Sequence, residues 1–170
     1  MAPWIDRFQA VAGLGAEEIK EDSRGRNADF FSIRADDGES LLHHTVRQNE
    51  PDKVEALAKH MNINTRDLEG NTPLHEAAEI GLVDMIKKLT ELGADPNARN
   101  KHAQTPLHLA AVRSSDATEA MLDGGADPNT RNNDYKTAWD LIQDRDVFKD
   151  TNAFWRLNDA RFDAEEEDAR

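Results

Sequence analysis

Residues 70–78 read Gly-Asn-Thr-Pro-Leu-His-Glu-Ala-Ala, and parts of this stretch recur along the 170-residue chain. Thr-Pro-Leu-His occurs at 72–75 and again at 105–108, an offset of 33 residues. Gly-Ala-Asp-Pro-Asn occurs at 93–97 and again at 125–129, an offset of 32 residues. Two motifs that recur at nearly the same period indicate an array of structural repeats.

Two weaker copies extend the array on both sides. Ser-Leu-Leu-His at 40–43 lies 32 residues before the first strong motif, and Thr-Ala-Trp-Asp-Leu at 137–141 lies 32 residues after the second. Terminal repeats expose an outer face to solvent, so their sequences are expected to depart from the pattern. The chain therefore contains two strong units flanked by two degenerate ones.

Each unit has the pattern of a turn, a short helix, a second turn and a longer helix. Thr72 is placed to cap the first helix, and Pro73 occupies its first turn, where a missing N–H costs nothing. The small residues 77–78 let neighbouring helices approach closely. Gly81 permits the positive φ that ends the first helix, and Gly93 ends the second. Since no single unit can bury its apolar face, the units must stack.

This pattern resembles the ankyrin repeat, in a small protein of three to four repeats with helical caps. The resemblance implies an all-α solenoid of helix-turn-helix units with β-hairpin loops between them. We predict repeats at 35–66, 67–99 and 100–131 and a degenerate repeat from 132 to 142 onward, with an N-terminal capping helix and linker at 1–34 and a C-terminal capping helix and acidic tail at 143–170.

Both flanks carry apolar residues at helical spacing. Spacings of i, i+4 and i+7 near the N-terminus predict a helix, and aromatic residues every seven positions near the C-terminus predict an amphipathic helix laid over the last repeat. These residues are Trp4, Phe8 and Val11 in the first segment, and Phe148, Trp155 and Phe162 in the second, with Val147, Phe154 and Leu157 beside them.

Composition excludes several classes of function. The chain has 21 Lys and Arg against 34 Asp and Glu, a net charge of −13, and no cysteine. The acidic balance argues against nucleic-acid and anionic membrane partners. The missing cysteines remove disulfides, zinc fingers and thiolate catalysis. Because neither a targeting signal nor a membrane span is visible, we expect a cytoplasmic protein. We also expect it to be monomeric on its own.

No constellation of residues indicates catalysis. His43, His75 and His108 hold the same place in successive units, and the resemblance implies a structural role in which each ring bonds the backbone of the adjoining loop. His75 and Glu76 could begin a His-Glu-x-x-His zinc motif, but its last position is Glu79. Nucleophile-elbow and phosphate-loop patterns are also missing. We therefore predict no enzyme activity, no metal site and no cofactor.

The resemblance implies that the loops form a row of fingers, which together with the short first helices make a concave binding face. Leu68, Ile80 and Val112 are apolar at places where folding does not require it, so we interpret them as anchors within a polar rim. The alternative is that isolated exposed apolar side chains are normal on any surface. The candidate partner-binding residues are Leu68, Glu69, Asn71, Glu79, Ile80, Lys101, His102, Gln104, Val112, Arg113 and Asp134, together with Arg66, Arg99 and Arg131.

The arginines at Arg34, Arg66, Arg99 and Arg131 recur at offsets of 32, 33 and 32 residues. Since packed helices lie about 8–10 Å apart, the guanidinium groups should form a row at that spacing. One interpretation is a charged rail for an acidic stripe on a partner. The alternative, which we favour, is that each arginine pairs with an acidic residue of the next finger, such as Asp67.

The excess negative charge lies mainly in the repeats and the tail. Residues 35–142 contain 19 acidic and 11 basic side chains, a net charge of −8, and residues 143–170 add −4. Long-range attraction then favours a protein partner with a basic face. We predict a non-catalytic protein-protein interaction module. The alternative is a dedicated inhibitor or immunity-type protein that blocks a basic enzyme or toxin, which fits the small size and the lack of another domain.

Overall fold

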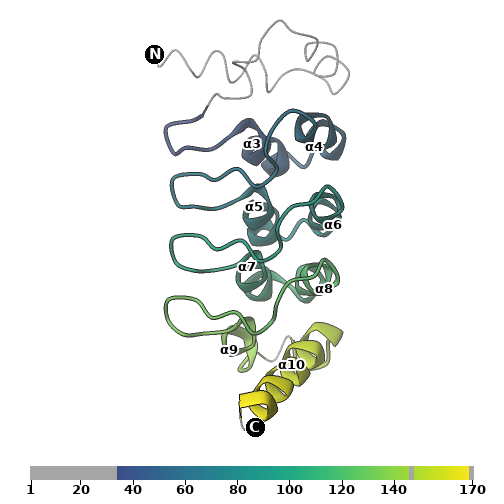
Figure 1. Cartoon of the computed structure of the whole chain (residues 1–170). Helices are drawn as coiled ribbons and strands as arrows, with labels where there is room; N and C mark the ends of the chain where they lie inside the picture. The colour runs from purple at the N-terminus through teal and green to yellow at the C-terminus, as the bar shows by residue number, and fades with distance from the viewer. Residues whose placement is uncertain (1–33, 146–147, 169–170) are drawn as a thin grey trace, which may run out of the picture.

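The computed structural model describes residues 34–145 and 148–168, with side chains described as far as Arg161 (Figure 1). Within these residues the chain is all-helical, as predicted. Short helices stack in one column, longer helices stack in a second column beside it, and loops project from the first column to one side. The predicted N-terminal helix with Trp4, Phe8 and Val11 lies outside the described residues.

The stack has two layers, because each of the first three units contributes one inner and one outer helix, and a last helix closes one end. Each inner helix packs against the next inner helix, and α10 packs against α8 and α9. The inner helices are α3 (Leu41–Arg47), α5 (Pro73–Ile80), α7 (Pro106–Arg113) and α9 (Ala138–Ile142), the outer helices are α4 (Pro51–Ala58), α6 (Val83–Glu91) and α8 (Ser115–Asp123), and the closing helix is α10 (Asn152–Asp168).

Helix α5 begins and ends where the motif predicts. Thr72 has an extended backbone before α5, Pro73 is the first helical residue, and Gly81 follows the helix with φ of 86°. A left-handed φ of this kind favours glycine, because a Cβ atom crowds the backbone there. Helix α5 is therefore held to about two turns, and the chain reverses directly into the outer helix α6.

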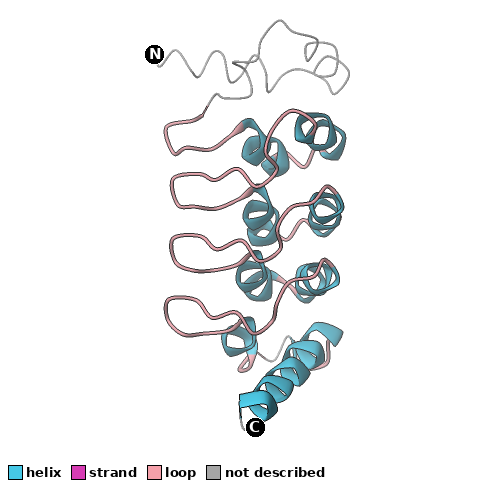
Figure 2. Cartoon of the chain, in the orientation of Figure 1, coloured by secondary structure: helices cyan, strands magenta, loops and turns pink. Residues whose placement is uncertain are grey.

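The loops between units are hairpin-shaped fingers, but the described residues contain no regular strand (Figure 2). In the second finger the Asp67 N–H donates to the Asn71 carbonyl over 3.0 Å, which closes the turn. Successive fingers are tied by one backbone bond, such as the Leu68 N–H to the Asp37 carbonyl at 2.9 Å. The predicted β-hairpins are thus too short for a ladder, and the part of the chain described holds one isolated bridge, between Arg34 and Ser40.

A continuous apolar core runs along the stack between the two helix columns. Small residues of the inner helices, such as Ala77 and Ala78, are fully buried, which lets the inner column pack closely. The largest fully buried side chains include Leu42, Leu57, Leu74, Ile86, Leu89, Leu107, Met121 and Ile142.

The C-terminal helix packs against the end of the stack, with Phe154 and Leu157 of the predicted face in contact with the core but Trp155 exposed. Phe148 is buried in the turn before α10, so it shares no helical register with the residues after Asn152. Ala153 and Leu157, one turn apart, are buried, whereas Trp155 is 54% exposed because it lies on the opposite side of the helix. The predicted stripe through Phe148 and Trp155 is therefore wrong, and Val147 and the side chain of Phe162 lie outside the description.

Candidate protein-binding surface

Buried histidines join each inner helix to the next finger. The Nδ1 atom of His75 accepts the Thr72 N–H over 3.1 Å, and its Nε2–H donates to the Gln104 carbonyl over 3.1 Å. His43 and His108 make the same two kinds of bond. This confirms the structural role of the three histidines. In the following finger, His43 donates to the Asn71 carbonyl and His108 donates to the Lys136 carbonyl.

Burial keeps these imidazoles neutral. It lowers the pKa of His75 to about 4 and lowers the pKa of His43 and His108 as well, because a charged ring would lose hydration. A neutral ring has one acceptor and one donor nitrogen, as the bonding pattern requires.

The fourth unit carries Asp140 where the others carry histidine. One Asp140 oxygen accepts from the Thr137 N–H over 2.8 Å and from its hydroxyl over 3.0 Å, so the helix start is still capped. A carboxylate offers no ring N–H to a further carbonyl. In the described residues α10 follows this unit and no fifth finger does, so the second bond of histidine has no counterpart here.

The recurring arginines bond forward along the stack. Arg66 donates to the Arg99 carbonyl over 2.6 Å and to the Gly70 carbonyl over 2.9 Å. Arg99 donates to the Arg131 carbonyl over 2.8 Å. Arg34 donates instead to the hydroxyl of a threonine in the next unit. Each of these three arginines therefore links its own unit to the following one.

The acceptors of the arginines differ from the predicted ones. We expected carboxylates such as Asp67, but the Asp67 oxygens accept from the backbone and side chain of Asn71, within the same finger. The carboxylate is already engaged in closing the turn, whereas the carbonyls of the next unit point toward the guanidinium groups. The prediction that Arg66 and Arg99 bond within the chain is thus confirmed, but the predicted carboxylate acceptors are wrong, because the acceptors are backbone carbonyls.

The fingertips carry a different side chain in each unit. Leu68 is 56% exposed, and in the next finger its register is held by Lys101. Glu69 lies 3.9 Å from the Lys101 ammonium and 4.0 Å from the His102 ring, so neighbouring tips meet through exposed charges. Asp134, at the tip of the fourth finger, is also exposed.

Two predicted residues belong to the bases of the fingers. Asn71 and Gln104 are half-buried, and their carbonyls accept from His43 and His75. The Asn71 side-chain oxygen also accepts from Asn100 over 2.9 Å. These two positions support the tips and contribute little surface of their own.

The ends of the inner helices supply the rest of the predicted set. Val112 is 51% exposed and Glu79 is exposed. Ile80 is only half-buried rather than exposed, and Arg113 lies across that end of α5, where its Nε–H donates to the Ile80 carbonyl over 2.9 Å. Leu68 and Val112 therefore fit an anchor role better than Ile80.

Tyr135 is not among the predicted residues, yet it is the most exposed large hydrophobic side chain that the described residues contain, at 78%. Its φ is 60°, in the left-handed region, where the same register in earlier fingers holds Gly38 and Gly70. Offsets of 32 and 33 residues place Ala103 and Tyr135 at this glycine position. A tyrosine in that register was the signal that could have identified it.

The described residues contain neither a metal-binding cluster nor a membrane-spanning helix. No group of three or more His, Asp or Glu side chains in those residues could hold a metal ion. None of the helices they form has both the length and the apolar character needed to cross a bilayer.

The chain matches two family models. A model of three ankyrin-repeat copies matches residues 10–100, and a single ankyrin-repeat model matches residues 102–133. The first match begins inside the segment predicted as an N-terminal cap, and that boundary stays a prediction.

Among curated proteins, the chain is similar to several much longer ones. It is 34% identical over 104 residues to a transient receptor potential cation channel subfamily A member 1 homolog of Caenorhabditis elegans, covering 56% of this chain and 9% of that protein. It is 35% identical over 89 residues to a B-cell lymphoma 3 protein homolog of Mus musculus, covering 52% of this chain and 20% of that protein. It is 40% identical over 83 residues to the human ankyrin repeat and SOCS box protein 6, covering 47% and 20%.

This chain thus spans about a tenth to a fifth of the length of these relatives. The first family model alone covers more than half of the residues. Together with the stacked helix pairs, the histidine and arginine bonds between units and the projecting fingers, this match shows that the chain belongs to the ankyrin-repeat family.

Proposed function

We propose that this chain is a monomeric, non-catalytic binding module that holds one protein partner against its fingertips and the exposed ends of its inner helices. Ankyrin repeats generally mediate protein–protein interaction. The observation that carries the proposal is the exposure of Leu68 in the second finger and Val112 near the end of α7, each more than half open to solvent. Apolar anchors within a polar rim are the usual anatomy of a protein interface.

Charge on the fingers supports a basic partner. The first finger exposes Asp36 and Asp37, and the second exposes Glu69. Behind them Glu39 and Glu76 share one cation, Arg47, so both carboxylates are already engaged within the chain. The exposed carboxylates at the tips are therefore the ones that a basic group on a partner would meet.

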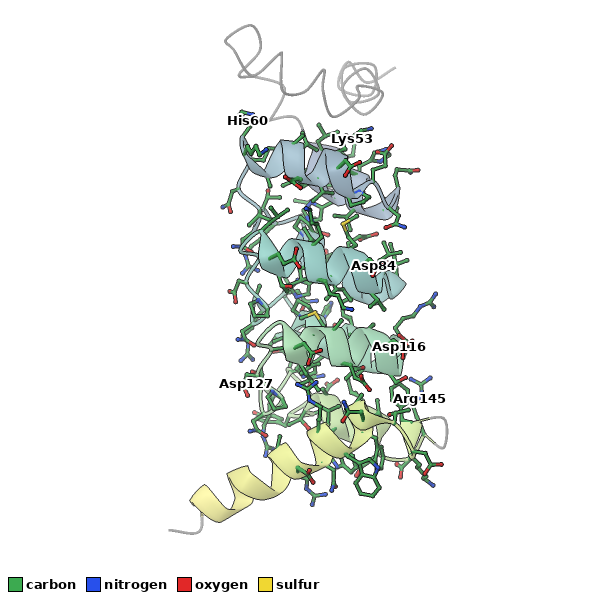
Figure 3. All side chains as sticks on the ribbon, turned by 90° about the vertical axis from the view of Figure 1, so that its right-hand side faces the viewer. Lys53, His60, Asp84, Asp116, Asp127 and Arg145 are labelled. Carbon is green, nitrogen blue, oxygen red and sulfur yellow. The ribbon has the colours of Figure 1, made fainter. Side chains whose placement is uncertain are left out.

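The outer helices add to the negative field from the far side of the stack. Asp84 and Asp116 lie at the same end of α6 and α8, as Figure 3 shows. Charges of this kind raise the rate of encounter with an oppositely charged protein without touching it. We therefore assign them to attraction and the finger side to contact.

The test combines capture with titration. Changing Leu68 and Val112 together to Asp should weaken partner binding by about tenfold or more, because truncated anchors typically cost more than ~1 kcal/mol each. Capture from native lysate by the unaltered chain identifies the partner, and calorimetric titration measures its affinity for each variant.

The matched control adds the same two charges elsewhere. Asn62→Asp with Asn129→Asp places them in the exposed loops that follow α4 and α8. This control should bind normally, and the thermal unfolding of all three proteins should agree. Equal affinity of the Leu68/Val112 variant and the unaltered chain, with folding intact, would contradict the proposal.

The same titration separates a scaffold from an inhibitor. If the chain is an inhibitor of a basic enzyme or toxin, one equivalent should abolish the partner's own activity. One equivalent of the Leu68/Val112 variant should leave most of that activity intact. A scaffold should leave the activity unchanged while binding with the same stoichiometry.

A further inference from the structure

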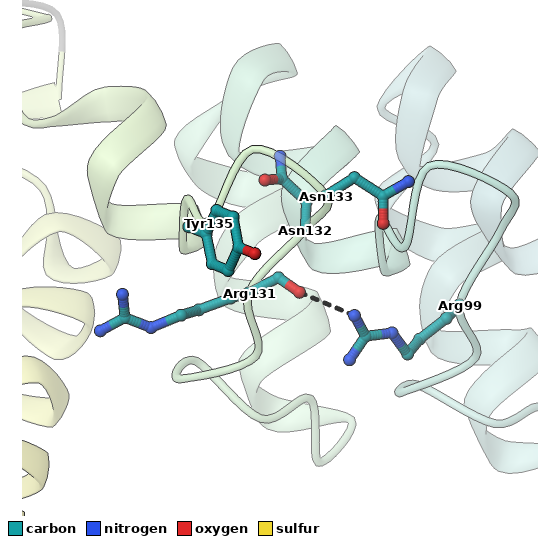
Figure 4. A pocket seen from close by; sticks show the side chains of 5 residues that line it. All are labelled: Arg99, Arg131, Asn132, Asn133 and Tyr135. Atoms are coloured by element: carbon teal, nitrogen blue, oxygen red, sulfur yellow. Dashed lines mark hydrogen bonds between the residues drawn. The ribbon is translucent and has the colours of Figure 1, made fainter.

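An open surface pocket of about 540 Å³ lies at the last finger, lined by Arg99, Arg131, Asn132, Asn133 and Tyr135 (Figure 4). Its asparagines are fixed in place. The Asn132 side-chain oxygen accepts from two backbone N–H groups of its own finger, and the Asn133 amide donates to the Lys101 carbonyl over 3.1 Å. The pocket is therefore a preformed feature of the fourth finger.

The arginine row ends in this pocket. Arg99 donates one hydrogen bond to the Arg131 carbonyl. The guanidinium of Arg131, by contrast, has no hydrogen-bond or ion-pair partner within the described part of the chain. Figure 4 shows the Arg131 side chain directed away from Arg99 and past the finger. Five N–H donors in a planar fork are therefore available for an acceptor from outside.

Tyr135 gives the pocket a wall that the other fingers lack. Gly38, Gly70 and Ala103 hold the same register, so a large ring stands there in the fourth finger alone among the described ones. Its φ of 60° is a conformation that disfavours a bulky side chain. Strained positions of this kind are concentrated at binding sites.

We propose that this pocket binds a carboxylate of the protein partner, with the Arg131 fork as the donor and the Tyr135 ring as a flat wall beside it. This rests on the proposed function and names one subsite of it. An arginine fork matches the two oxygens of a carboxylate, and an aromatic face covers the apolar stem of an acidic side chain. A nucleic acid is a poor candidate, because the chain as a whole carries a net charge of −13.

Together with the acidic first finger, the pocket fixes the orientation in which a partner can bind along the row of fingers. The first finger exposes the carboxylates of Asp36 and Asp37, and the fourth exposes the Arg131 guanidinium. Three steps of about 8–10 Å separate these fingers. The partner should therefore present a basic group and an acidic group roughly 25–30 Å apart, and the reversed orientation would bring like charges together.

The test uses a blocked tetrapeptide with two adjacent glutamates as the probe, so that it does not depend on finding the partner. Titration followed by NMR should shift the Arg131 Nε–H and Tyr135 backbone signals saturably. Arg131→Gln should weaken binding about tenfold, since it removes a charge-assisted fork. Arg131→Lys should weaken it less, because the charge stays.

Two further variants separate the pocket from general charge and from folding. Lys136→Gln removes the same charge from the same finger outside the pocket lining, and should change binding less than about twofold. Tyr135→Gly relieves the left-handed strain, so it should weaken probe binding without lowering the melting temperature.

Two other probes identify the source of the carboxylate. Glutamine in place of glutamate should abolish the shifts, whereas a glutamine peptide with a free C-terminus would restore them if a chain end fits. Binding of a phosphoserine peptide alone, no saturable shift, or equal losses in Arg131→Gln and Lys136→Gln would overturn the proposal. These outcomes would leave the Leu68 and Val112 test of the proposed function unaffected.

Discussion

The bases and the tips of the fingers differ in how closely they follow the repeat. At the bases, His43, His75 and His108 each donate to a carbonyl of the next finger over 3.0–3.1 Å. At the tips, by contrast, Leu68, Lys101 and Asn133 hold one register with an apolar, a basic and an amide side chain.

The difference indicates where stability and binding reside. A base position meets the same neighbours in every unit, so the same residue satisfies it each time. A tip position meets solvent, so packing does not decide its residue. The periodic residues therefore hold the stack together, and the residues that break the period are the ones open to a partner.

The sharpest test of this comparison replaces one histidine at the base. His75→Ala leaves the Thr72 N–H and the Gln104 carbonyl without their partner and opens a void, so we expect a loss of about 3 kcal/mol in the free energy of unfolding. Urea denaturation at pH 7 measures it. His102→Ala at an exposed tip is the control, with an expected change of less than ~0.5 kcal/mol. Similar losses for both would contradict the division.

Low pH should destabilise the chain through the same buried histidines at the bases of the fingers. The pKa of His75 is lowered to about 4 in the folded chain, against about 6.5 in the unfolded chain. Between these values the unfolded state binds more protons, so stability should be fully present above pH 6.5 and fall as the pH drops toward 4. The expected loss from His75 is about 3 kcal/mol by pH 4. Denaturation between pH 4 and 7 should show a shallower slope for His75→Gln, and an unchanged slope would sink this account.

Gly38 in the first finger and Gly93 in the loop after α6 differ in the space around them, so alanine at each should destabilise the chain by a different amount. A Cβ atom on Gly38, whose φ is +77°, would lie 2.8 Å from the Leu68 nitrogen, whereas one on Gly93, whose φ is +88°, would meet nothing within 4 Å. We expect Gly38→Ala to cost about 2 kcal/mol, through strain and collision, and Gly93→Ala about 1 kcal/mol, through strain alone. Thermal unfolding ranks the two variants, and a cost for Gly93→Ala as large as that for Gly38→Ala would contradict the close approach.

The smallest expected effect concerns the arginine row. Arg66→Ala removes the bonds to the carbonyls of Arg99 and Gly70, at an expected cost of about 1 kcal/mol. Arg131→Ala removes no such bond among the described residues and should stay within ~0.5 kcal/mol. Urea unfolding of both variants checks this, and a larger loss for Arg131→Ala would show that it supports the stack after all.

Patterns that depend on local geometry were predictable. Capping by Thr72 and the glycine that ends α5 follow from residues a few positions apart, whereas the structural role of the histidines was implied by the family resemblance. Details that depend on contacts between units were not. The acceptor of Arg66 is a carbonyl 33 residues away, and no local pattern shows which groups of the next finger remain unpaired.

Exposure at the ends of helices was predicted only in part. Val112 is exposed, but Ile80 is half-buried at an end of α5 that Arg113 crosses. Trp155 faces solvent because α10 buries its other side, with Ala153 and Leu157, against the stack. In both cases the deciding factor is a packing contact with another part of the chain.

By itself, the sequence determined the architecture, because a period of 32 or 33 residues with capping and turn residues at fixed places permits few other folds. The tertiary structure decided which of the recurring residues are already engaged. It assigns the carbonyl bonds to Arg66 and Arg99, leaves the fork of Arg131 open and places the Tyr135 ring beside it. The physical reason is that each unit is completed by its neighbour, so the last finger of the row differs from the others even where its sequence repeats theirs.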